Sequence, residues 1–529
     1  MTIFKASSPS ITQMIVWQAD WRGNDAAIVF NRQTCTWKSF HLQTNRIANL
    51  LISRGVGKGQ RVVVLMENST QMIEVLFGVI KAGASVVPIN LSVSDEALSN
   101  QIMDSQATTI IATEKQSTRV NKIAGILAIN PQLLKISYGK AVDNWLDFES
   151  LVGQASKATP DVQLQREDEC NVIYSSGTTG LPKGIVHLHG PRFDWAYDLT
   201  IALRFHSGAR TICSLGLYSN ISWVSMLCSI LTGGLMVVQE KFSAEEFIEL
   251  VEEYQLTHCA GVPIQYQRVF DNDRFTRNKL SSLQMLMCCG SPMSESLKQM
   301  VDDNIGCDLI ELYGLTEGVI TTLAPEDRKR KPSSVGKPLP GTQIAILNAN
   351  DQLAMSGCSG EIIARGRILM AGYLNRPDAD REASWQDQQG NVWLRTGDIG
   401  KLDKQGFLYL VDRKKDMIIS GGQNIYPQDL EKTLLSHPDI SEAAVIGVNS
   451  QQWGETPLAL VVARKEANLD SAAVSASVLD VESIRGWANQ KLGKQQKIAE
   501  VKQVISLPRN PNGKLEKKRI REEYKDYTI

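Results

Sequence analysis

Apolar residues along the N-terminal half of the chain recur in strand-length runs that alternate with longer apolar stretches. The run RVVVLM at 61–66 is apolar after its first residue, which indicates a strand buried on both faces. The stretch 69–82 ends at Gly83 and predicts a helix, and SVVPIN after it predicts the next strand. This order predicts a β-α-β unit with parallel strands.

A second unit of the same kind follows at 234–262. GLMVVQ at 234–239 and the residues at 257–262 predict strands, and 243–254 predicts the helix between them. Ser243 and Glu246 have the spacing of a capping box, in which each side chain bonds the other's backbone N–H. Repetition of such units predicts an α/β fold of layered, mostly parallel sheets and helices.

The pattern changes towards the C-terminus. Residues 332–400 are rich in turns and carry short alternating strands such as GTQIAIL and GEIIARG. Beyond 412, a helix that begins at Pro427, the strands AAVIGV and LALVVA, and a helix at 481–492 predict a compact α+β unit. We therefore expect a large N-terminal domain over 1–412 and a small domain over 413–529.

Composition narrows the class of protein. Hydrophobic residues make up 43% and charged residues 21%, and the formal net charge is -1, so no global field favours nucleic acid as a partner. The N-terminus lacks the pattern of a signal peptide, and no apolar stretch reaches the ~20 residues that span a bilayer. Nine scattered cysteines without a C-x-x-C pair indicate reduced thiols rather than zinc ligands. We expect a cytoplasmic protein without a membrane span.

The strongest local feature is YSSGTTGLPKG at 174–184, directly after the apolar NVIY. Glycines let backbone amides approach a ligand, hydroxyls donate to phosphate oxygens, and Lys183 offsets charge. The loop is not a Walker A motif, because Gly184 rather than Ser or Thr follows the lysine. It predicts a polyphosphate site.

This loop resembles the phosphate-binding signature of the adenylate-forming superfamily, which includes acyl- and aryl-CoA synthetases, the adenylation domains of peptide synthetases, and luciferases. Six further motifs occur in the family's order: GSP at 290–292, YGLTE at 313–317, GYLN at 372–375, RTGD at 395–398, DRKKD at 412–416 running into SGGQNIYP at 420–427, and PNGK at 511–514. The resemblance extends from about residue 10 to the end. It implies a small β-barrel-like subdomain in the large domain and a mobile C-terminal domain.

The resemblance implies ATP, Mg²⁺ and coenzyme A as cofactors, and a small carboxylic acid as substrate. Attack of a carboxylate on the α-phosphorus of ATP brings two anions together, so the reaction needs positive charge and a metal. The implied phosphate and metal residues are Thr178, Thr179, Gly180 and Lys183 for the leaving phosphates, Thr316 for the α-phosphate, and Glu317 with Thr178 for Mg²⁺.

The nucleoside and the second half-reaction involve further implied residues. For adenine these are Gly290, Ser291, Pro292, Glu311 and Tyr313, with Asp398 on the ribose hydroxyls and Arg413 beside the ribose or phosphate. A structural ion pair is the other interpretation of Asp398 and Arg413. In the family, Lys514 bridges the carboxylate and α-phosphate during adenylation, Lys415 stands at the hinge position, and Gly421 and Gly422 let the pantetheine chain pass.

The acid pocket departs from the family's pattern. Its expected residues are Tyr218, Ser219, Asn220, Trp223, Gly261 and Gly314. Ser219 stands where a histidine is usual, and Asn220 corresponds to an asparagine of aryl-acid activating relatives. Trp223 is either a pocket wall or a core residue. No acidic residue is positioned for an α-amino group, so an aromatic or medium-length hydrophobic acid is favoured over an amino acid.

The leading hypothesis is an acyl- or aryl-CoA ligase that is a monomer or homodimer. An adenylating enzyme that loads a separate carrier protein uses the same pantetheine thiol, so the sequence separates the two poorly. A catalytically silent nucleotide-binding protein on this fold is a third hypothesis, and retention of Lys183, Glu317, Asp398 and Lys514 argues against it. Oxygen-dependent light emission, the activity of the luciferases in this superfamily, is the least favoured hypothesis.

Overall fold

The computed structural model describes residues 9–123, 132–175, 182–413, 416–420, 423–464, 478–493, 496–509 and 515–529. The chain divides into two compact units. The first comprises Met1–Pro332, Gly336–Gln343 and Arg365–Trp393, and the second comprises Ser333–Val335, Ile344–Ala364 and Leu394–Ile529. The predicted domain boundary after residue 412 stays a prediction.

The first unit contains two large sheets. The nine-stranded sheet has the order β16-β15-β14-β13-β12-β10-β11-β1-β2. Its strands are β1 (Ala26–Phe30), β2 (Gln33–Thr36), β10 (Arg210–Cys213), β11 (Leu235–Val238), β12 (His258–Gly261), β13 (Met285–Cys288), β14 (Asp308–Gly314), β15 (Ile320–Leu323) and β16 (Lys337–Pro338). All pairings from β1 through β11, β10, β12 and β13 to β14 are parallel.

The eight-stranded sheet has the order β19-β9-β8-β4-β3-β5-β6-β7. Its strands are β3 (Arg61–Leu65), β4 (Ser85–Pro88), β5 (Thr109–Thr113), β6 (Leu134–Tyr138), β7 (Leu146–Asp147), β8 (Glu169–Ser175), β9 (Lys183–Leu188) and β19 (Gly372–Tyr373). The predicted strand at 61–66 and its parallel partner are β3 and β4. Successive residues of β3 join different core clusters, Val62 and Val64 on one face and Val63 and Leu65 on the other, as a doubly buried strand requires.

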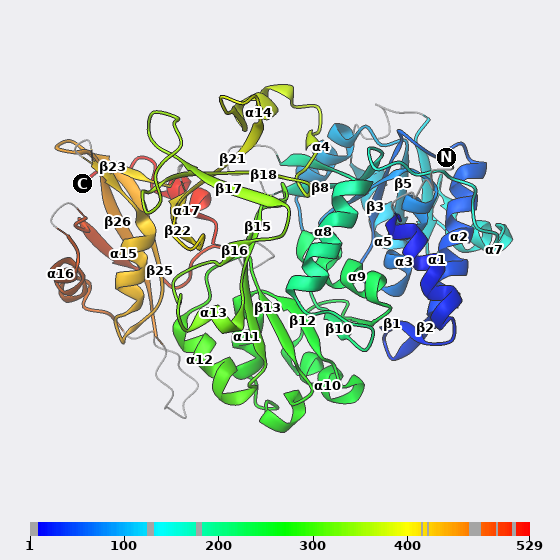
Figure 1. The fold of residues 1–529 in the computed structure, drawn as a ribbon, viewed down its shortest axis with the longest axis horizontal. Coiled ribbons are helices and arrows are strands. Elements are labelled where there is room, and N and C mark those ends of the chain that lie inside the picture. Colours follow the sequence, from blue (N-terminus) through cyan, green and yellow to red (C-terminus); the bar gives the residue numbers. More distant parts are fainter. Residues whose placement is uncertain are drawn as a thin grey trace, which may run out of the picture. The chain divides into compact units, whose positions relative to one another are not determined.

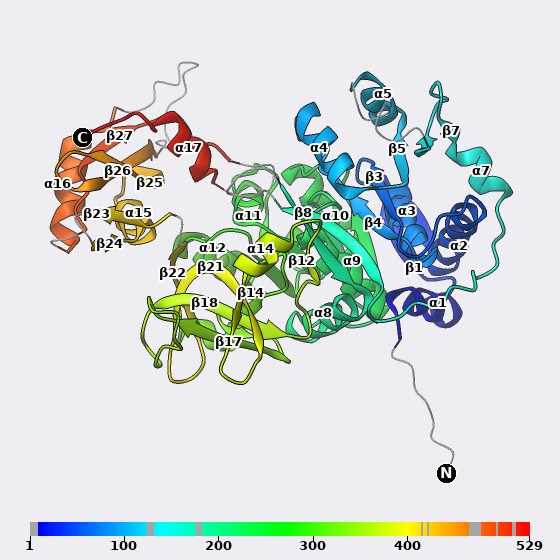
Figure 2. The same cartoon turned by 90° about the horizontal axis from the view of Figure 1, so that it is seen from above.

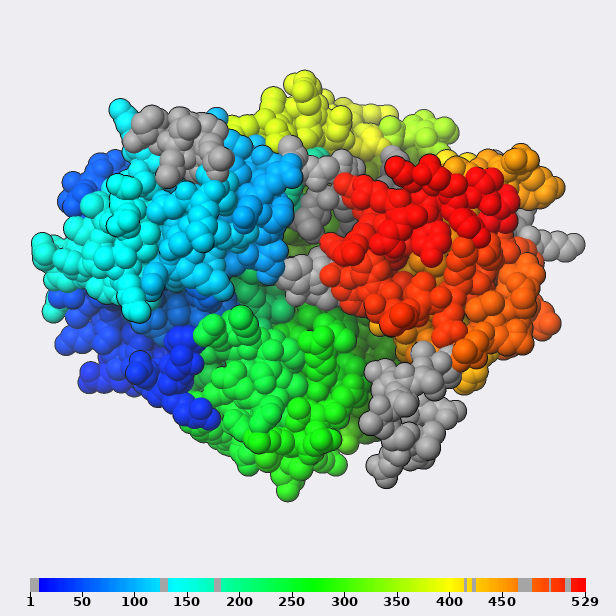
Figure 3. Space-filling view, turned by 180° about the vertical axis from the view of Figure 1, so that it is seen from behind, coloured from blue at the N-terminus to red at the C-terminus, as the bar shows by residue number. Residues whose placement is uncertain are grey.

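Helices cover the faces of both sheets in the first unit. They are α1 (Ile11–Arg22), α2 (Trp37–Ser53), α3 (Thr70–Lys81), α4 (Asp95–Ser105), α5 (Glu114–Lys122), α7 (Phe148–Gln154), α8 (His189–Ala202), α9 (Asn220–Thr232), α10 (Ala244–Tyr254), α11 (Pro263–Phe270), α12 (Glu295–Asn304), α13 (Pro325–Arg328) and α14 (Pro377–Glu382). Helices α1, α2 and α3 lie side by side in Figures 1 and 2. Figure 3 shows the surface of this unit from behind, with its blue and cyan N-terminal segments beside green segments of the nine-stranded sheet's helices.

Three core clusters define the layers of this unit. The largest combines residues of both sheets with residues of α2, α3, α8 and α9, so these helices pack between the sheets. A second cluster joins the nine-stranded sheet to α10, α11 and α12, and a third joins the eight-stranded sheet to α4 and α5. The predicted α/β class with layered, mostly parallel sheets is confirmed.

The remaining strands form two smaller sheets. One has the order β17-β18-β21-β20 with β22 paired to β21, and contains the turn-rich strands that were expected in a barrel-like subdomain. The other, of order β24-β23-β26-β25 with β27 paired to β26, packs with α15, α16 and α17 as the predicted α+β unit. The bounds are β17 (Thr342–Leu347), β18 (Gly360–Gly366), β20 (Ser384–Gln386), β21 (Val392–Leu402), β22 (Leu408–Arg413), β23 (Ile418–Ser420), β24 (Gln423–Ile425), α15 (Pro427–Leu435), β25 (Ile440–Ser450), β26 (Gly454–Ala463), α16 (Val481–Lys491), β27 (Glu500–Gln503) and α17 (Lys517–Glu523).

Helix α3 buries a carboxyl group inside the largest core cluster. Glu74 is 8% exposed, and burial raises its pKa from 4.5 to about 8. The folded chain therefore holds a proton that the unfolded chain releases between these two pKa values. Below pH 4.5 the carboxyl group is protonated in both states and does not destabilise the fold. As the pH rises from 4.5 to about 8, the unfolded chain loses this proton first, so the free energy of unfolding falls.

Replacement of Glu74 by glutamine should remove this pH dependence, because the amide does not ionise. The quantity to compare is the thermal midpoint of Glu74→Gln minus that of the unsubstituted protein. This difference should be roughly 2–4 °C larger at about pH 8.5 than at about pH 5. Thermal unfolding followed by circular dichroism at both pH values measures this. An equal difference in thermal midpoint at the two pH values would contradict the raised pKa of Glu74.

Candidate functional site

Four neighbouring parallel strands end at one edge of the nine-stranded sheet. The register pairs Gly261 of β12 with Cys288 of β13, and Cys288 with Glu311 of β14. The segment 214–219 leaves β10 at the same edge, because β10 pairs in parallel with β12. Clefts at the carboxyl ends of parallel strands are common ligand sites. The structure therefore places four segments, which follow or include residues 214–219, Gly261, Cys288 and Glu311, at one edge of the sheet, although they lie up to about 100 residues apart in sequence.

The turn at Gly290 is packed against two of these segments. Its φ of +86° is in the left-handed region, which favours glycine. A Cβ placed there would lie 3.3 Å from Cγ1 of Val262 and 3.8 Å from Cδ1 of Ile221. Gly290 thus lies close to Val262, which follows Gly261, and to Ile221, which follows Asn220. Ser291 is partly buried and Pro292 is exposed.

Glu311 is held by a lysine that the sequence analysis did not single out. Nζ of Lys298 on α12 lies 2.8 Å from Oε1 of Glu311 and 2.9 Å from Oε1 of Glu295. Burial raises the pKa of Glu311, and the lysine opposes that rise. The ion pair fixes Glu311 at the strand end, where partly buried Tyr313 and exposed Gly314 follow in β14.

A second group of site residues centres on Tyr373. Its hydroxyl donates to Oε1 of Glu317 at 2.8 Å, and Nζ of Lys183 lies 4.6 Å from the centre of its ring. Tyr373 of β19 pairs with Ile185 of β9, the strand that begins with Lys183. One aromatic side chain therefore links a predicted phosphate-binding lysine to a predicted metal-binding carboxylate.

Close backbone packing fixes the turn that carries Thr316 and Glu317. The carbonyl of Glu317 accepts from the backbone N–H of Met370 at 2.8 Å. Gly318 follows with φ of +101°, and a Cβ there would lie 2.1 Å from the carbonyl oxygen of Ile368. A larger residue at this position would push the turn away from the segment that leads to β19.

Mg²⁺ is usually bound by one or two carboxylates together with substrate phosphates. Among the described residues, no group of three or more His, Cys, Asp or Glu side chains forms a ready-made metal site. An oriented carboxylate such as that of Glu317, beside a lysine suited to phosphate, fits Mg²⁺ that arrives with a nucleotide.

The predicted acid-pocket residues lie at the start of α9. Oγ of Ser219 accepts from the backbone N–H of Ile221 at 3.4 Å, so the residue that replaces histidine caps the helix. Asn220 is the first helical residue, and Tyr218 before the cap is partly buried. Trp223 is fully buried in the core, and its indole N–H donates to the carbonyl of Leu217 at 3.1 Å. This agrees with the interpretation of Trp223 as a core residue.

Sequence reasoning missed Arg192 of α8, which contacts the predicted acid pocket. Its Nη1 donates to Oδ1 of Asn220 at 2.9 Å and its Nε donates to Oδ1 of Asn171 at 3.0 Å. The residue is 1% exposed, and burial lowers its pKa to about 10, so it keeps its charge at neutral pH. The signal in the sequence was an arginine close to Trp195 and Leu199, which belong to the core.

The second unit contains the remaining candidates. Asp398 of β21 is 5% exposed, and its backbone pairs with that of Arg413 in β22. The backbone N–H of Asp398 donates to Oγ1 of Thr396 at 3.1 Å, which fixes the bend of the RTGD segment. Seven predicted residues lie outside the described part of the chain: Thr178, Thr179, Gly180, Lys415, Gly421, Gly422 and Lys514.

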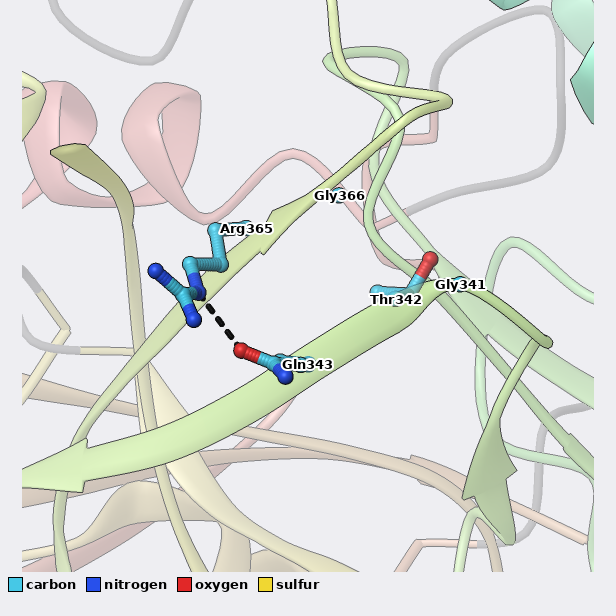
Figure 4. A pocket seen from close by; sticks show the side chains of 5 residues that line it. All are labelled: Gly341, Thr342, Gln343, Arg365 and Gly366. Carbon is cyan, nitrogen blue, oxygen red and sulfur yellow. Dashed lines mark hydrogen bonds between the residues drawn. The ribbon is translucent and has the colours of Figure 1, made fainter. Parts of the chain in front are cut away.

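A surface hollow of about 400 Å³ contains none of the predicted residues. Figure 4 shows its lining by Gly341, Thr342, Gln343, Arg365 and Gly366. Nε of Arg365 donates to Oε1 of Gln343 at 2.5 Å, and its guanidinium lies 4.9 Å from the ring of Trp393. These contacts give the arginine a structural role. Separately, none of the described helices is long and apolar enough to cross a membrane.

Comparisons with known proteins agree with this geometry. The family model described as AMP-binding enzyme matches residues 15–374, and that described as AMP-binding enzyme C-terminal domain matches 429–514. A long-chain-fatty-acid–CoA ligase of Mycobacterium tuberculosis is 32% identical over 499 residues, which cover 92% of this chain and 93% of that protein.

Two solved structures are similar over nearly the whole chain. ATP-bound MatB from Rhodopseudomonas palustris has a TM-score of 0.87 and 25% identity, covering 98% of this chain and 99% of that chain. The o-succinylbenzoate coenzyme A synthetase from Bacillus subtilis, in complex with ATP and magnesium ion, has a TM-score of 0.79 and 26% identity, covering 95% and 98%.

Proposed function

Because the chain belongs to the family of AMP-binding enzymes, we propose that it converts a small carboxylic acid to an acyl-adenylate and transfers the acyl group to free coenzyme A. The resemblance of its motifs to the adenylate-forming superfamily is confirmed. The chain is an AMP-forming acyl-CoA synthetase, and its cofactors are ATP, Mg²⁺ and coenzyme A.

The contact of Lys183, Tyr373 and Glu317 carries the proposal. Displacement of pyrophosphate requires a cation at the leaving phosphates and an oriented carboxylate for Mg²⁺. The Tyr373 hydroxyl holds one oxygen of Glu317, so the carboxylate is oriented before the nucleotide arrives. Thr178, Thr179 and Gly180 would complete the phosphate site, Thr316 would contact the α-phosphate, and Thr178 would help Glu317 hold Mg²⁺.

The edge of the nine-stranded sheet is the proposed nucleoside and acid site. Glu311, held by Lys298, would accept from the adenine amino group, while Tyr313 stacks on the ring. The Gly290 turn lies beside the start of α9, so the adenine segment and the acid segment are neighbours. Tyr218, Ser219, Asn220, Gly261 and Gly314 would line the acid pocket, with Trp223 as the core behind it.

Further proposed roles fall on residues of the second unit. Asp398 is buried, as suits a carboxylate that accepts both ribose hydroxyls, and Arg413 is its backbone neighbour. Lys514 would stabilise charge only during adenylation, and Gly421 and Gly422 would line the pantetheine path after movement about Lys415. Alternating use of one site limits attack by water on the mixed anhydride.

The names of the relatives do not decide the acid. One relative is named for long-chain fatty acids and another for o-succinylbenzoate, which are chemically distant. The predicted aromatic or medium-length acid is therefore kept, as are the predicted cytoplasmic location and the monomeric or homodimeric state. The alternative is transfer of the acyl group to the phosphopantetheine thiol of a carrier protein instead of coenzyme A.

The proposal predicts AMP release that depends on ATP, coenzyme A and an acid. We would measure AMP across aromatic and aliphatic acids, with pyrophosphate exchange into ATP run in parallel. Turnover with coenzyme A is the expected result. Exchange without turnover by coenzyme A would indicate a carrier-protein loader, and the absence of both across all acids would contradict the proposal.

Removal of the Tyr373 hydroxyl should weaken the metal site. Tyr373→Phe should lower the rate of pyrophosphate exchange roughly tenfold and raise the Mg²⁺ concentration for half-maximal rate, because Glu317 loses a charged hydrogen bond. Tyr527→Phe is the matched control, since its hydroxyl donates to Oε1 of Glu500 at 2.9 Å and neither residue belongs to the predicted site. Equal effects of both substitutions would show that Tyr373 acts only on stability.

A further inference from the structure

Arg192 is a buried cation without a carboxylate partner among the described residues. Its side chain is 1% exposed and forms none of the ion pairs in the described part of the chain. A buried charge is costly unless it is paired and hydrogen-bonded. The guanidinium has five N–H donors, and its two acceptors are neutral amide oxygens. The protein thus maintains a charge whose cost its own side chains offset only in part.

The acidic residues of the same helix are committed elsewhere. Oδ2 of Asp194 accepts from Nη2 of Arg166 at 2.6 Å, and Asp198 pairs with Arg367. The rings of Trp195 and Trp223 contact the Arg192 guanidinium, with centroids 4.9 and 5.1 Å from its Cζ. Contacts with aromatic faces stabilise a cation but accept no hydrogen bond in the plane of the guanidinium.

Several donors around Arg192 have no acceptor. The donors Nη2 of Arg192 and Nδ2 of Asn171 are buried without a hydrogen-bond partner, and the ring nitrogen Nε2 of His187, a donor or an acceptor according to the tautomer, is also buried without one. Asn171 of β8 and His187 of β9 are directly opposite each other in the antiparallel register, so their side chains lie on one face of the sheet. Burial, followed by the charge of Arg192, lowers the pKa of His187, so the imidazole is neutral.

The hydrogen bond to Arg192 also orients the amide of Asn220. Because Oδ1 accepts from Nη1, the NH₂ end of the Asn220 amide is the end that remains to donate. Asn220 is partly buried at the first position of α9, where backbone N–H groups and the helix dipole favour negative charge. Arg192 of α8, Asn171 of β8 and Asn220 of α9 therefore place N–H donors around one guanidinium beside the predicted acid pocket.

We propose that Arg192 and Asn220 recognise a second anionic group on the acid substrate, so that the preferred acids are dicarboxylic. This inference rests on the proposed function, since it assigns the acid end of that site. The carboxylate that is activated reacts at the nucleotide, while the other accepts from Nη2 of Arg192 and from the amide of Asn220. A carboxylate matches the planar donor fork of a guanidinium.

The test compares each dicarboxylic acid with its monomethyl ester, which keeps the shape and removes one charge. Straight-chain diacids of increasing length and the benzenedicarboxylic acids cover aliphatic and aromatic classes. The readout is acid-dependent pyrophosphate exchange into ATP, which requires adenylation alone. A charged hydrogen bond corresponds to roughly 10- to 100-fold in affinity. We expect the unsubstituted protein to favour at least one diacid over its ester by that factor in kcat/KM.

Arg192→Met should abolish this preference while exchange with the ester persists, because methionine keeps much of the side-chain volume without the charge. Arg166→Met is the matched control, since it removes a guanidinium that contacts the same helix through Asp194. The control should keep the preference for the diacid. Arg192→Lys, which retains the charge but loses the planar fork, should keep part of it.

The outcomes separate the inference from the proposed function. Exchange with neutral acids or esters that equals or exceeds exchange with every diacid would overturn the inference and leave the proposed function standing. An Arg192→Met variant with an unchanged preference would do the same. Absence of exchange with every acid would overturn both. If Arg192→Met fails to fold by circular dichroism, the preference of the unsubstituted protein decides alone.

Discussion

Backbone hydrogen bonds hold β10, β12, β13 and β14 parallel and in register, so all four strands end at one edge of the nine-stranded sheet. Parallel strands need a crossover that returns the chain to the opposite edge, and α11 and α12 form such crossovers. Each strand therefore delivers the residues that follow it to the same place. The proposed nucleoside and acid contacts are a consequence of this arrangement.

The same unit shows how the protein treats buried charge. Lys298 is paired with Glu311, and Nζ of Lys81 lies 2.9 Å from Oδ1 of Asn45, while burial lowers the pKa of Lys81 to about 7. Burial likewise raises the pKa of Glu74 to about 8, towards the neutral form. Buried groups here are paired or shifted towards neutrality. Arg192 has only neutral hydrogen-bond acceptors, and its guanidinium stays charged at neutral pH.

Local patterns in the sequence predicted local structure well. The predicted helix at 69–82 is α3, capped by Ser69, and the predicted helix at 243–254 is α10, where Oγ of Ser243 accepts from the backbone N–H of Glu246. Only that half of the predicted capping box forms, because the Glu246 carboxylate accepts from Gln239 instead. The structure also places the segments of Gly290 and Glu311 at the same edge of the nine-stranded sheet, while the roles of these residues stay predictions.

Contacts between distant residues could not be predicted in this way. Tyr373 was part of a motif, but its bond to Glu317 depends on β19 pairing with β9, which periodicity does not encode. The role of Arg192 depends on Asn171 and Asn220, which belong to different elements. Ser219 stood out as a departure from the family, and only the structure shows that it caps α9.

Oxygen-18 labelling shows whether a carboxylate oxygen of the acid attacks the α-phosphorus of ATP. An accepted acid labelled in both carboxylate oxygens would be turned over with ATP and coenzyme A, and the products analysed by mass spectrometry. One labelled oxygen is expected in AMP and none in pyrophosphate, because thiol attack at the acyl carbon leaves the bridging oxygen on AMP. Label in inorganic phosphate or pyrophosphate, or unlabelled AMP, would contradict attack by a carboxylate oxygen.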